Sequence, residues 1–124
     1  MPSKPFVALV GMPSHHPMVP EGVRDDVKKQ LALVVQQMED AGYSSEVIYV
    51  TPEDGMDKMT QEFKSRPLDG IVIGFGIRGI PQNTFFFEQV VEAVRRGSPK
   101  AILMFNTSPE STVDAAKRWF KAEP

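Results

Sequence analysis

The sequence predicts an α/β fold, a three-layer sandwich in which helices cover both faces of a four-stranded parallel sheet. Two observations predict it. Four short apolar runs, rich in residues that favour β-structure, alternate with longer amphipathic segments, at residues 6–10, 46–50, 70–75 and 101–105. Three of these runs are continuously apolar, as is typical of parallel strands buried on both faces. The run 46–50 includes Glu46 and Tyr49, which makes it more amphipathic and indicates an edge strand.

The first two helices are predicted from the spacing of apolar residues and from their end signals. Apolar residues recur at three- and four-residue steps from about 21 to 41, and Gly42 is a natural stop for that helix. The second helix is expected to start with Thr51 as its N-cap and Pro52 at its first helical position, followed by acidic residues in the first turn. Pro67 closes it.

The last two helices have equally clear boundaries. The third is expected to be capped by Asn83 or Thr84 and to stop at Gly97, after two arginines in its last turn. The fourth starts at Ser108, followed by Pro109 and Glu110. It is expected to pack through residues that include Val113, Ala116, and either Trp119 or Phe120.

Length and composition limit the classes of protein to which this chain can belong. Its 124 residues suit one domain, 1–124, and 41% hydrophobic with 24% charged residues fits a folded chain with a core. The absence of cysteine excludes thiolate nucleophiles and disulfides and suits the cytoplasm. A net charge of -2 gives no basic footprint for nucleic acid, and no apolar run suggests a signal peptide or a membrane segment.

The strict alternation of strands and helices favours right-handed crossovers within one sheet. This architecture resembles small flavodoxin-like domains, which implies the strand order 2-1-3-4, although the sequence leaves the order open. In such sheets ligands bind beyond the carboxyl ends of the strands, where the order reverses. The loops after the first and third strands, 11–20 and 74–84, should therefore flank a crevice, and loop 106–109 should lie close to it.

The distribution of charge predicts an anion site in this crevice. No Asp, Glu, Lys or Arg occurs between Lys4 and Glu21 or between Lys100 and Glu110, and only Arg78 is charged between 69 and 88. One guanidinium beside several helix N-termini would suit a phosphate, carboxylate or enolate. Alternatively, the strand ends are merely buried and Arg78 pairs with a helix carboxylate. The predicted ligand-binding residues are Ser14, Gly76, Arg78, Gly79, Asn83, Thr84, Asn106, Thr107 and Ser108.

Both histidines of the chain, His15 and His16, fall in the first loop. They are the candidate catalytic residues, since an imidazole can move a proton near neutral pH. Because neighbours on an extended loop point apart, only one of them should face a ligand, and either one could instead hold the turn. Two adjacent histidines without cysteine or a nearby carboxylate motif do not form a metal site within one chain.

Three glycines, Gly74, Gly76 and Gly79, have the spacing G-x-G-x-x-G of dinucleotide-binding loops. The context does not fit, because Pro81 and a new helix cap intervene and the next strand ends without a carboxylate. We therefore predict no cofactor, and expect the glycines to allow positive φ angles or close backbone approach.

Three consecutive phenylalanines, residues 85–87, cannot all share one narrow helical stripe, so at least one should lie outside it. That ring could make a wide core contact under a loop, line a ligand pocket or contact another subunit. Together with the two open edges of a four-stranded sheet, they suggest a homo-oligomer, most simply a dimer.

Two functions fit the sequence. The first is a small enzyme that acts on an anionic metabolite by His-mediated proton transfer, as a lyase, isomerase or hydrolase. The second is a noncatalytic module that senses an anion or nucleotide or binds another protein.

Overall fold

A computed structural model describes residues 4–121; residues 1–3 and 122–124 of the predicted domain lie outside the described part. The strands are β1 (Phe6–Gly11), β2 (Ser44–Tyr49), β3 (Gly70–Ile73) and β4 (Ile102–Phe105), and the 3-10 turns are η1 (Glu21–Val23), η2 (Pro81–Asn83) and η3 (Pro109–Ser111). The α-helices are α1 (Arg24–Asp40), α2 (Met56–Lys64), α3 (Phe75–Arg78), α4 (Thr84–Gly97) and α5 (Thr112–Lys117).

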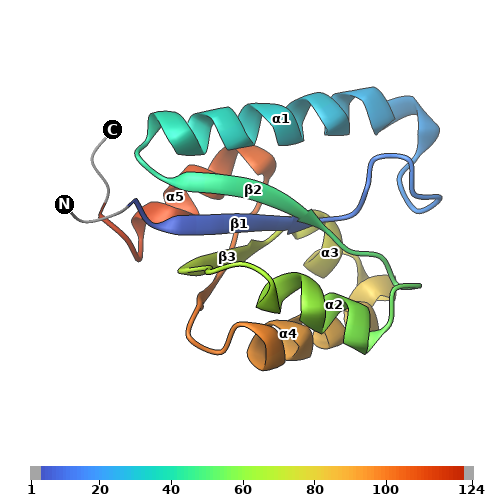
Figure 1. Cartoon of the computed structure of the whole chain (residues 1–124). Coiled ribbons are helices and arrows are strands. Elements are labelled where there is room, and N and C mark those ends of the chain that lie inside the picture. Colours follow the sequence, from blue (N-terminus) through green and yellow to red (C-terminus); the bar gives the residue numbers. More distant parts are fainter. Residues whose placement is uncertain (1–3, 122–124) are drawn as a thin grey trace.

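The four strands form one parallel sheet in the order β2-β1-β3-β4, which confirms the predicted fold class and strand order. Helices α1 and α5 lie on one face of this sheet and α2 and α4 on the other (Figure 1). Alternate residues of β1 point into the two cores, Val7 and Leu9 toward α1 and α5, Ala8 and Val10 toward α2 and α4. β1 is thus buried on both faces, as its continuous apolar run predicts.

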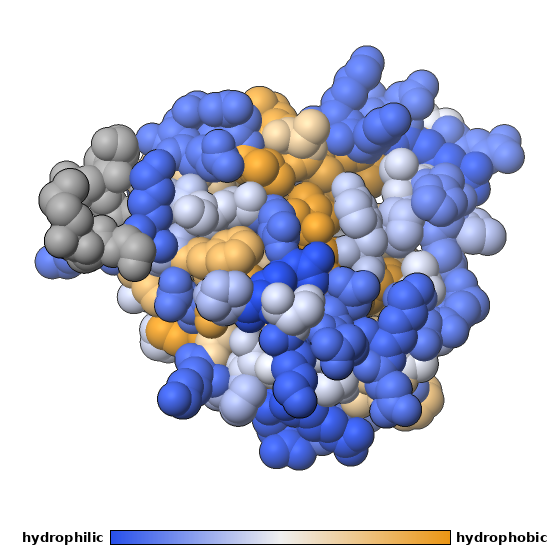
Figure 2. Space-filling model, viewed as in Figure 1, coloured by the Kyte–Doolittle hydropathy of each residue, from blue (hydrophilic) through white to orange (hydrophobic). Residues whose placement is uncertain are grey.

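The two sheet edges differ in character. β2 is the edge strand that its amphipathic sequence predicts, and its Glu46 pairs with Arg66. Figure 2, seen from the side on which β2 lies, shows a mostly hydrophilic face with hydrophobic residues mainly in the upper middle. β4 is the opposite edge, and its four residues Ile102–Phe105 include no polar side chain.

The prediction for the start of α2 was wrong. Thr51 and Pro52 do not begin the helix; residues 51–54 form a separate turn, in which the Asp54 carboxylate accepts hydrogen bonds from the Thr51 N–H and hydroxyl. Gly55 follows at φ 81°, and the helix begins only at Met56. A positive φ breaks the helical path, and glycine adopts it without steric strain. Gly42, at φ 98°, ends α1 as expected.

Residues 74–79 differ from the expected glycine loop because they form a helical turn. Neither Gly74, Gly76 nor Gly79 has a positive φ; within residues 4–121 only Gly42 and Gly55 do. Close approach explains two of the three. A Cβ at Gly74 would lie 3.1 Å from the Val10 carbonyl oxygen, and one at Gly79 would lie 2.6 Å from the Phe75 ring.

The last two helical segments lie where the sequence predicts them, but their first turns differ from the prediction. α4 spans Thr84–Gly97, but neither Asn83 nor Thr84 makes a side-chain cap at its start. The segment from Ser108 begins as η3, closed by reciprocal hydrogen bonds between Ser108 and Ser111, before α5 continues it. Phe120 packs on the core beside α5, whereas Trp119 is 58% exposed.

The three phenylalanines of α4 face different surroundings, as their sequence predicts. Phe86 is buried, Phe87 contacts Phe105 edge-to-face with ring centroids 6.0 Å apart, and Phe85 is 70% exposed. At its other end α4 lies against α2, where a Cβ at Gly97 would come within 2.4 Å of the Thr60 carbonyl oxygen. In the described part of the chain no helix has the length and apolar character needed to cross a membrane.

Candidate functional site

A cavity of about 430 Å³ lies at the carboxyl ends of β1 and β3, the position that the strand order predicts for a ligand site. The end of β1, the loop that follows it, η1 and α1 form one wall, and α3 with the loop after β4 forms the other. Its apolar lining residues include Met12, Met18, Val23, Val27, Phe75, Ile77 and Ile80.

The cavity lining contains no Asp, Glu, Lys, Arg or His. Three of its side chains also belong to the large hydrophobic residues exposed on the surface: Met18 at 39%, Val23 at 43% and Phe75 at 43%. Exposed apolar groups that gather at a concave site mark binding surfaces more often than isolated ones do. The lining therefore favours contact with an apolar molecule over contact with a charged one.

The polar lining is small, and part of it is already engaged. Besides Gln30, Thr107 and Ser108, it includes Asn106, which is buried. The Asn106 Oδ1 accepts a hydrogen bond of 2.8 Å from the Phe75 N–H, and its Nδ2 donates to the Thr112 Oγ1 over 2.9 Å. Asn106 therefore fixes the first residue of α3 beside the loop after β4, and so shapes the cavity wall.

Arg78, the predicted anion-binding residue, lies at the end of α3 and is not part of the lining. Its Nη2 donates a hydrogen bond of 2.9 Å to the Asn106 carbonyl oxygen. Its guanidinium carbon lies 5.1 Å from the centre of the Phe75 ring and 5.4 Å from that of Phe105. Among residues 4–121 its buried Nε has no hydrogen-bond partner. In this arrangement Arg78 braces the cavity wall from outside through cation–π contacts.

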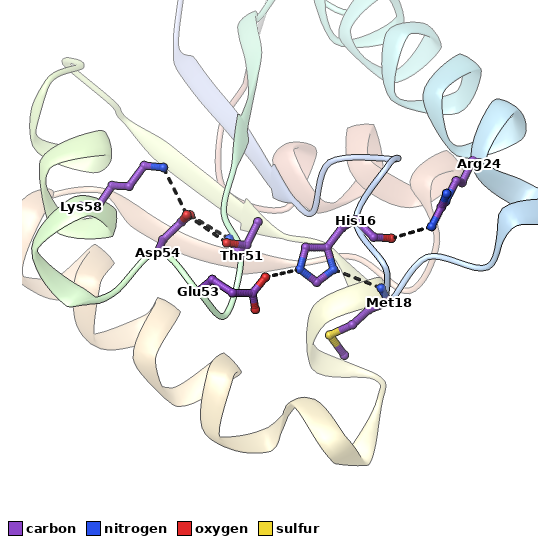
Figure 3. A network of polar contacts seen from close by, with 7 residues as sticks. All are labelled: His16, Met18, Arg24, Thr51, Glu53, Asp54 and Lys58. Atoms are coloured by element: carbon purple, nitrogen blue, oxygen red, sulfur yellow. Dashed lines mark hydrogen bonds and ion pairs between the residues drawn. The ribbon is translucent and has the colours of Figure 1, made fainter.

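The two histidines have different environments, and neither lines the cavity. His15 is exposed, whereas His16 is 7% exposed. The His16 Nδ1 accepts a hydrogen bond of 3.1 Å from the Met18 N–H, and its Nε2 lies 2.5 Å from a Glu53 carboxylate oxygen (Figure 3). Because Nδ1 acts as an acceptor, a neutral ring carries its proton on Nε2, and this N–H donates a hydrogen bond to the Glu53 carboxylate. Both ring nitrogens of His16 are thus engaged within the chain.

The contacts around His16 hold the loop after β1 in place. Arg24, at the start of α1, donates from its Nε to the Val19 carbonyl oxygen over 3.1 Å and from its Nη2 to the His16 carbonyl oxygen over 3.4 Å. Figure 3 shows this loop between Arg24 on one side and Glu53 on the other. Since Met18 and Val19 belong to the cavity lining, the network positions one wall of the cavity.

Glu53 belongs to the turn 51–54 after β2, which the Asp54 carboxylate stabilises. Burial alone would raise the pKa of the Asp54 carboxyl. The hydrogen bonds from Thr51 and the ion pair with Lys58 outweigh burial, so the pKa of Asp54 lies below its ordinary value. The turn that presents Glu53 to His16 therefore contains a carboxylate held in its charged form.

The structure brings four of the predicted site residues together at the cavity, namely Gly76, Asn106, Thr107 and Ser108. The other seven are outside its lining: Ser14, His15, His16, Arg78, Gly79, Asn83 and Thr84. Asn83 is buried without a partner for its Nδ2 within the described chain, and the Thr84 hydroxyl donates to the Pro81 carbonyl oxygen.

Sequence reasoning missed the apolar lining residues Met12, Met18, Val23, Val27, Phe75 and Ile80, and it missed Glu53 as the partner of His16. A signal for Glu53 was present, because adjacent parallel strands bring the loops that follow them to the same end of the sheet. Among residues 4–121, no group of three or more His, Asp or Glu side chains could hold a metal ion.

Comparison with protein-family models, with curated proteins and with solved structures finds no match, so the function is proposed from the geometry.

Proposed function

We propose that this protein is a small-molecule-binding module whose ligand is predominantly apolar and uncharged. The observation that carries the proposal is the cavity of about 430 Å³ at the topological switch point, whose lining has no charged side chain. Its volume falls within the range of about 300–1,000 Å³ that is usual for ligand pockets, which are lined mainly by apolar groups with a few polar ones.

The polar side chains of the cavity lining indicate which polar groups the ligand could have. Thr107 and Ser108 lie on one wall and Gln30 on the other, so a hydroxyl, carbonyl or amide group would find a partner at either wall. An ionised ligand would lose hydration in this cavity without a countercharge, and such burial is unfavourable. This favours a noncatalytic carrier or sensor of a neutral molecule.

The predicted enzyme, acting on an anionic metabolite by proton transfer from His15 or His16, is the competing proposal. It would require the exposed His15 to turn into the cavity, or His16 to release Glu53 or the Met18 N–H. It would also require Arg78 to turn from the Asn106 carbonyl oxygen toward the ligand. These rearrangements give the two proposals different tests.

The test uses Nile red, an uncharged dye that fluoresces in apolar surroundings, and inorganic phosphate as the anionic probe. Two substitutions on α1 form a matched pair: Val27→Asp on the cavity wall and Leu33→Asp at a site that is 54% exposed and outside the lining. We expect saturable binding of Nile red that Val27→Asp weakens by about tenfold or more, because a carboxylate on the wall is desolvated by the dye. Leu33→Asp should leave the affinity within about twofold, since a surface change far from the site is nearly neutral.

The competing result is also defined. If phosphate raises the thermal midpoint of the wild type but not of Arg78→Ala, and Nile red does not bind saturably, the apolar-ligand proposal is wrong and the anion site is favoured. Equal loss of Nile red binding in Val27→Asp and Leu33→Asp would also contradict the proposal, because it would place the dye outside the cavity.

A further inference from the structure

The outer edge of β4 carries a row of backbone groups whose direction follows from its pairing with β3. The Ile102 N–H donates to the Asp69 carbonyl oxygen over 2.9 Å, so the backbone groups of Ile102 face β3. The backbone groups of successive residues point to opposite sides of a strand, so those of Met104 also face β3. The N–H and C=O groups of Ala101, Leu103 and Phe105 therefore point away from the sheet, at its open edge.

Two of these six outward groups are satisfied within the chain. The Ala101 N–H donates to the Ser98 carbonyl oxygen over 3.0 Å, and the Phe105 carbonyl oxygen accepts a hydrogen bond of 2.9 Å from Arg118. The remaining groups are the Ala101 C=O, the Leu103 N–H and C=O, and the Phe105 N–H. No residue between 4 and 121 forms a hydrogen bond with them.

We propose that β4 pairs antiparallel with β4 of a second copy of this chain, with Leu103 opposite the partner's Leu103. In this register each Leu103 exchanges both hydrogen bonds with its counterpart, and each Ala101 C=O accepts from the partner's Phe105 N–H. All the free groups are used. This register also sets the Ala101 N–H of one chain opposite the Phe105 C=O of the other. These two groups need no partner there, because each is already hydrogen-bonded within its own chain.

Other registers of the β4 pair are less favourable, because they leave backbone N–H and C=O groups without hydrogen-bond partners. A shift of two residues in either direction places a free group of one chain opposite an occupied group of the other, and it leaves half of the free groups without partners. A shift of one residue moves every side chain to the opposite face of the sheet. The hydrogen-bonding pattern of the β4 edge is thus complementary to itself in one register only.

The side chains fit the same arrangement. The pairing sets Phe105 opposite Ala101, a large residue beside a small one, and the two Leu103 side chains side by side on the face that α4 covers. Next to them is a hollow of about 230 Å³, lined by residues that include Val91, Val94, Ala101 and Leu103. Because β4 has no charged residue, nothing on the strand opposes the pairing, whereas Glu46 and Arg66 protect the β2 edge.

The test exploits the absence of cysteine from the chain. In the proposed register the Cα atoms of the two Leu103 residues lie about 5.5 Å apart, which is within disulfide range. Leu103→Cys should therefore form a covalent dimer on mild oxidation. Ala101→Cys is the control on the same strand, because the Cα atoms of its two copies would be about 14 Å apart and beyond disulfide range. Ser45→Cys is the control on the β2 edge.

Sedimentation of the unmodified chain should give a species of twice 13.8 kDa that dissociates on dilution. Leu103→Lys should sediment as a monomer with an unchanged circular dichroism spectrum, because it sets two like charges opposite each other. A wild-type monomer of 13.8 kDa up to about millimolar concentration would overturn the proposal, since specific interfaces usually associate well below that range. Cross-linking of Ala101→Cys or Ser45→Cys as readily as Leu103→Cys would overturn it as well.

Discussion

Gly97 is the point where α4 comes closest to α2, and its replacement by alanine tests whether size or backbone freedom makes glycine necessary there. It is the last residue of α4 and does not have a positive φ. A Cβ at this position would lie 2.4 Å from the Thr60 carbonyl oxygen, 3.0 Å from the Phe63 Cβ and 3.1 Å from the Lys64 nitrogen. Two of these atoms are α2 backbone, which cannot move away without shifting the helix.

Two opposing effects determine the result of Gly97→Ala. Alanine in a helical conformation gains about 0.5–1 kcal/mol over glycine from the lower entropy of the unfolded chain. Forcing an extra carbon between packed helices costs about 1–3 kcal/mol. We expect a net loss of about 1–2 kcal/mol in the free energy of unfolding, and a fall of several degrees in the thermal midpoint, about 3–6 °C for each kcal/mol in a domain of this size.

The assay is urea denaturation monitored by circular dichroism, in which the midpoint should fall while the slope stays constant. Gly76→Ala is the matched control, because Gly76 is also helical and a Cβ there would have no atom within 4 Å. That variant should be neutral or more stable than the wild type by up to about 1 kcal/mol. If Gly97→Ala is as stable as Gly76→Ala, the close contact of α4 with α2 does not have the energetic role assigned to it.

Two further predictions concern the turn and the loop beside the cavity. Because the pKa of Asp54 is lower in the folded chain than its ordinary value, its stabilisation is complete above that ordinary value and is lost as the pH falls through the folded-state pKa. Urea midpoints measured from pH 6 down to about 2.5 should therefore drop more for the wild type than for Asp54→Asn, and parallel curves would contradict this assignment. His16→Ala should raise the exchange rate of the Met18 amide by about fivefold, as expected for a lost hydrogen bond worth about 1 kcal/mol. Hydrogen exchange measured by NMR checks this, with His15→Ala as the unaffected control, and an unchanged Met18 rate in His16→Ala would show that the imidazole does not hold the loop.

The fold was predictable because its signals are repeated along the chain. Apolar runs of strand length alternate with amphipathic segments, and this pattern alone determines a parallel sheet with helices on both faces. The start of α2 was not predictable from the same kind of signal. Thr51, Pro52 and Asp54 have the identities of a helix N-terminus, but they close one turn and then meet Gly55 at φ 81°. These residue types correctly indicate a turn closed by side-chain hydrogen bonds. The positive φ of Gly55 then sets the start of the helix at Met56.

The position of the candidate site was predictable, but its chemical character was not. Strand order places a crevice after β1 and β3, and the cavity is there. The charge-free segments indicated either an anion site or simple burial, and sequence alone does not tell in which direction a side chain points. Arg78 bonds to the Asn106 carbonyl oxygen outside the cavity, and His16 to Glu53, a residue 37 positions away in the chain. Apolar residues such as Met18 and Phe75 occupy the lining instead.

The central place of β1 has a consequence for the order in which this protein becomes structured during synthesis. Of the four strands of this sheet β1 is synthesised first, and both of its neighbours, β2 and β3, are made later. Its apolar residues Val7 to Val10 are fully or almost fully buried in the final structure. Val7 and Leu9 must therefore wait for α1 and α5 before they are covered, and Ala8 and Val10 must wait for α2 and α4. Pairing through crossovers is slow compared with hairpin formation. β1 thus keeps an uncovered apolar face, which favours aggregation of the nascent chain, until α4 has emerged to residue 97.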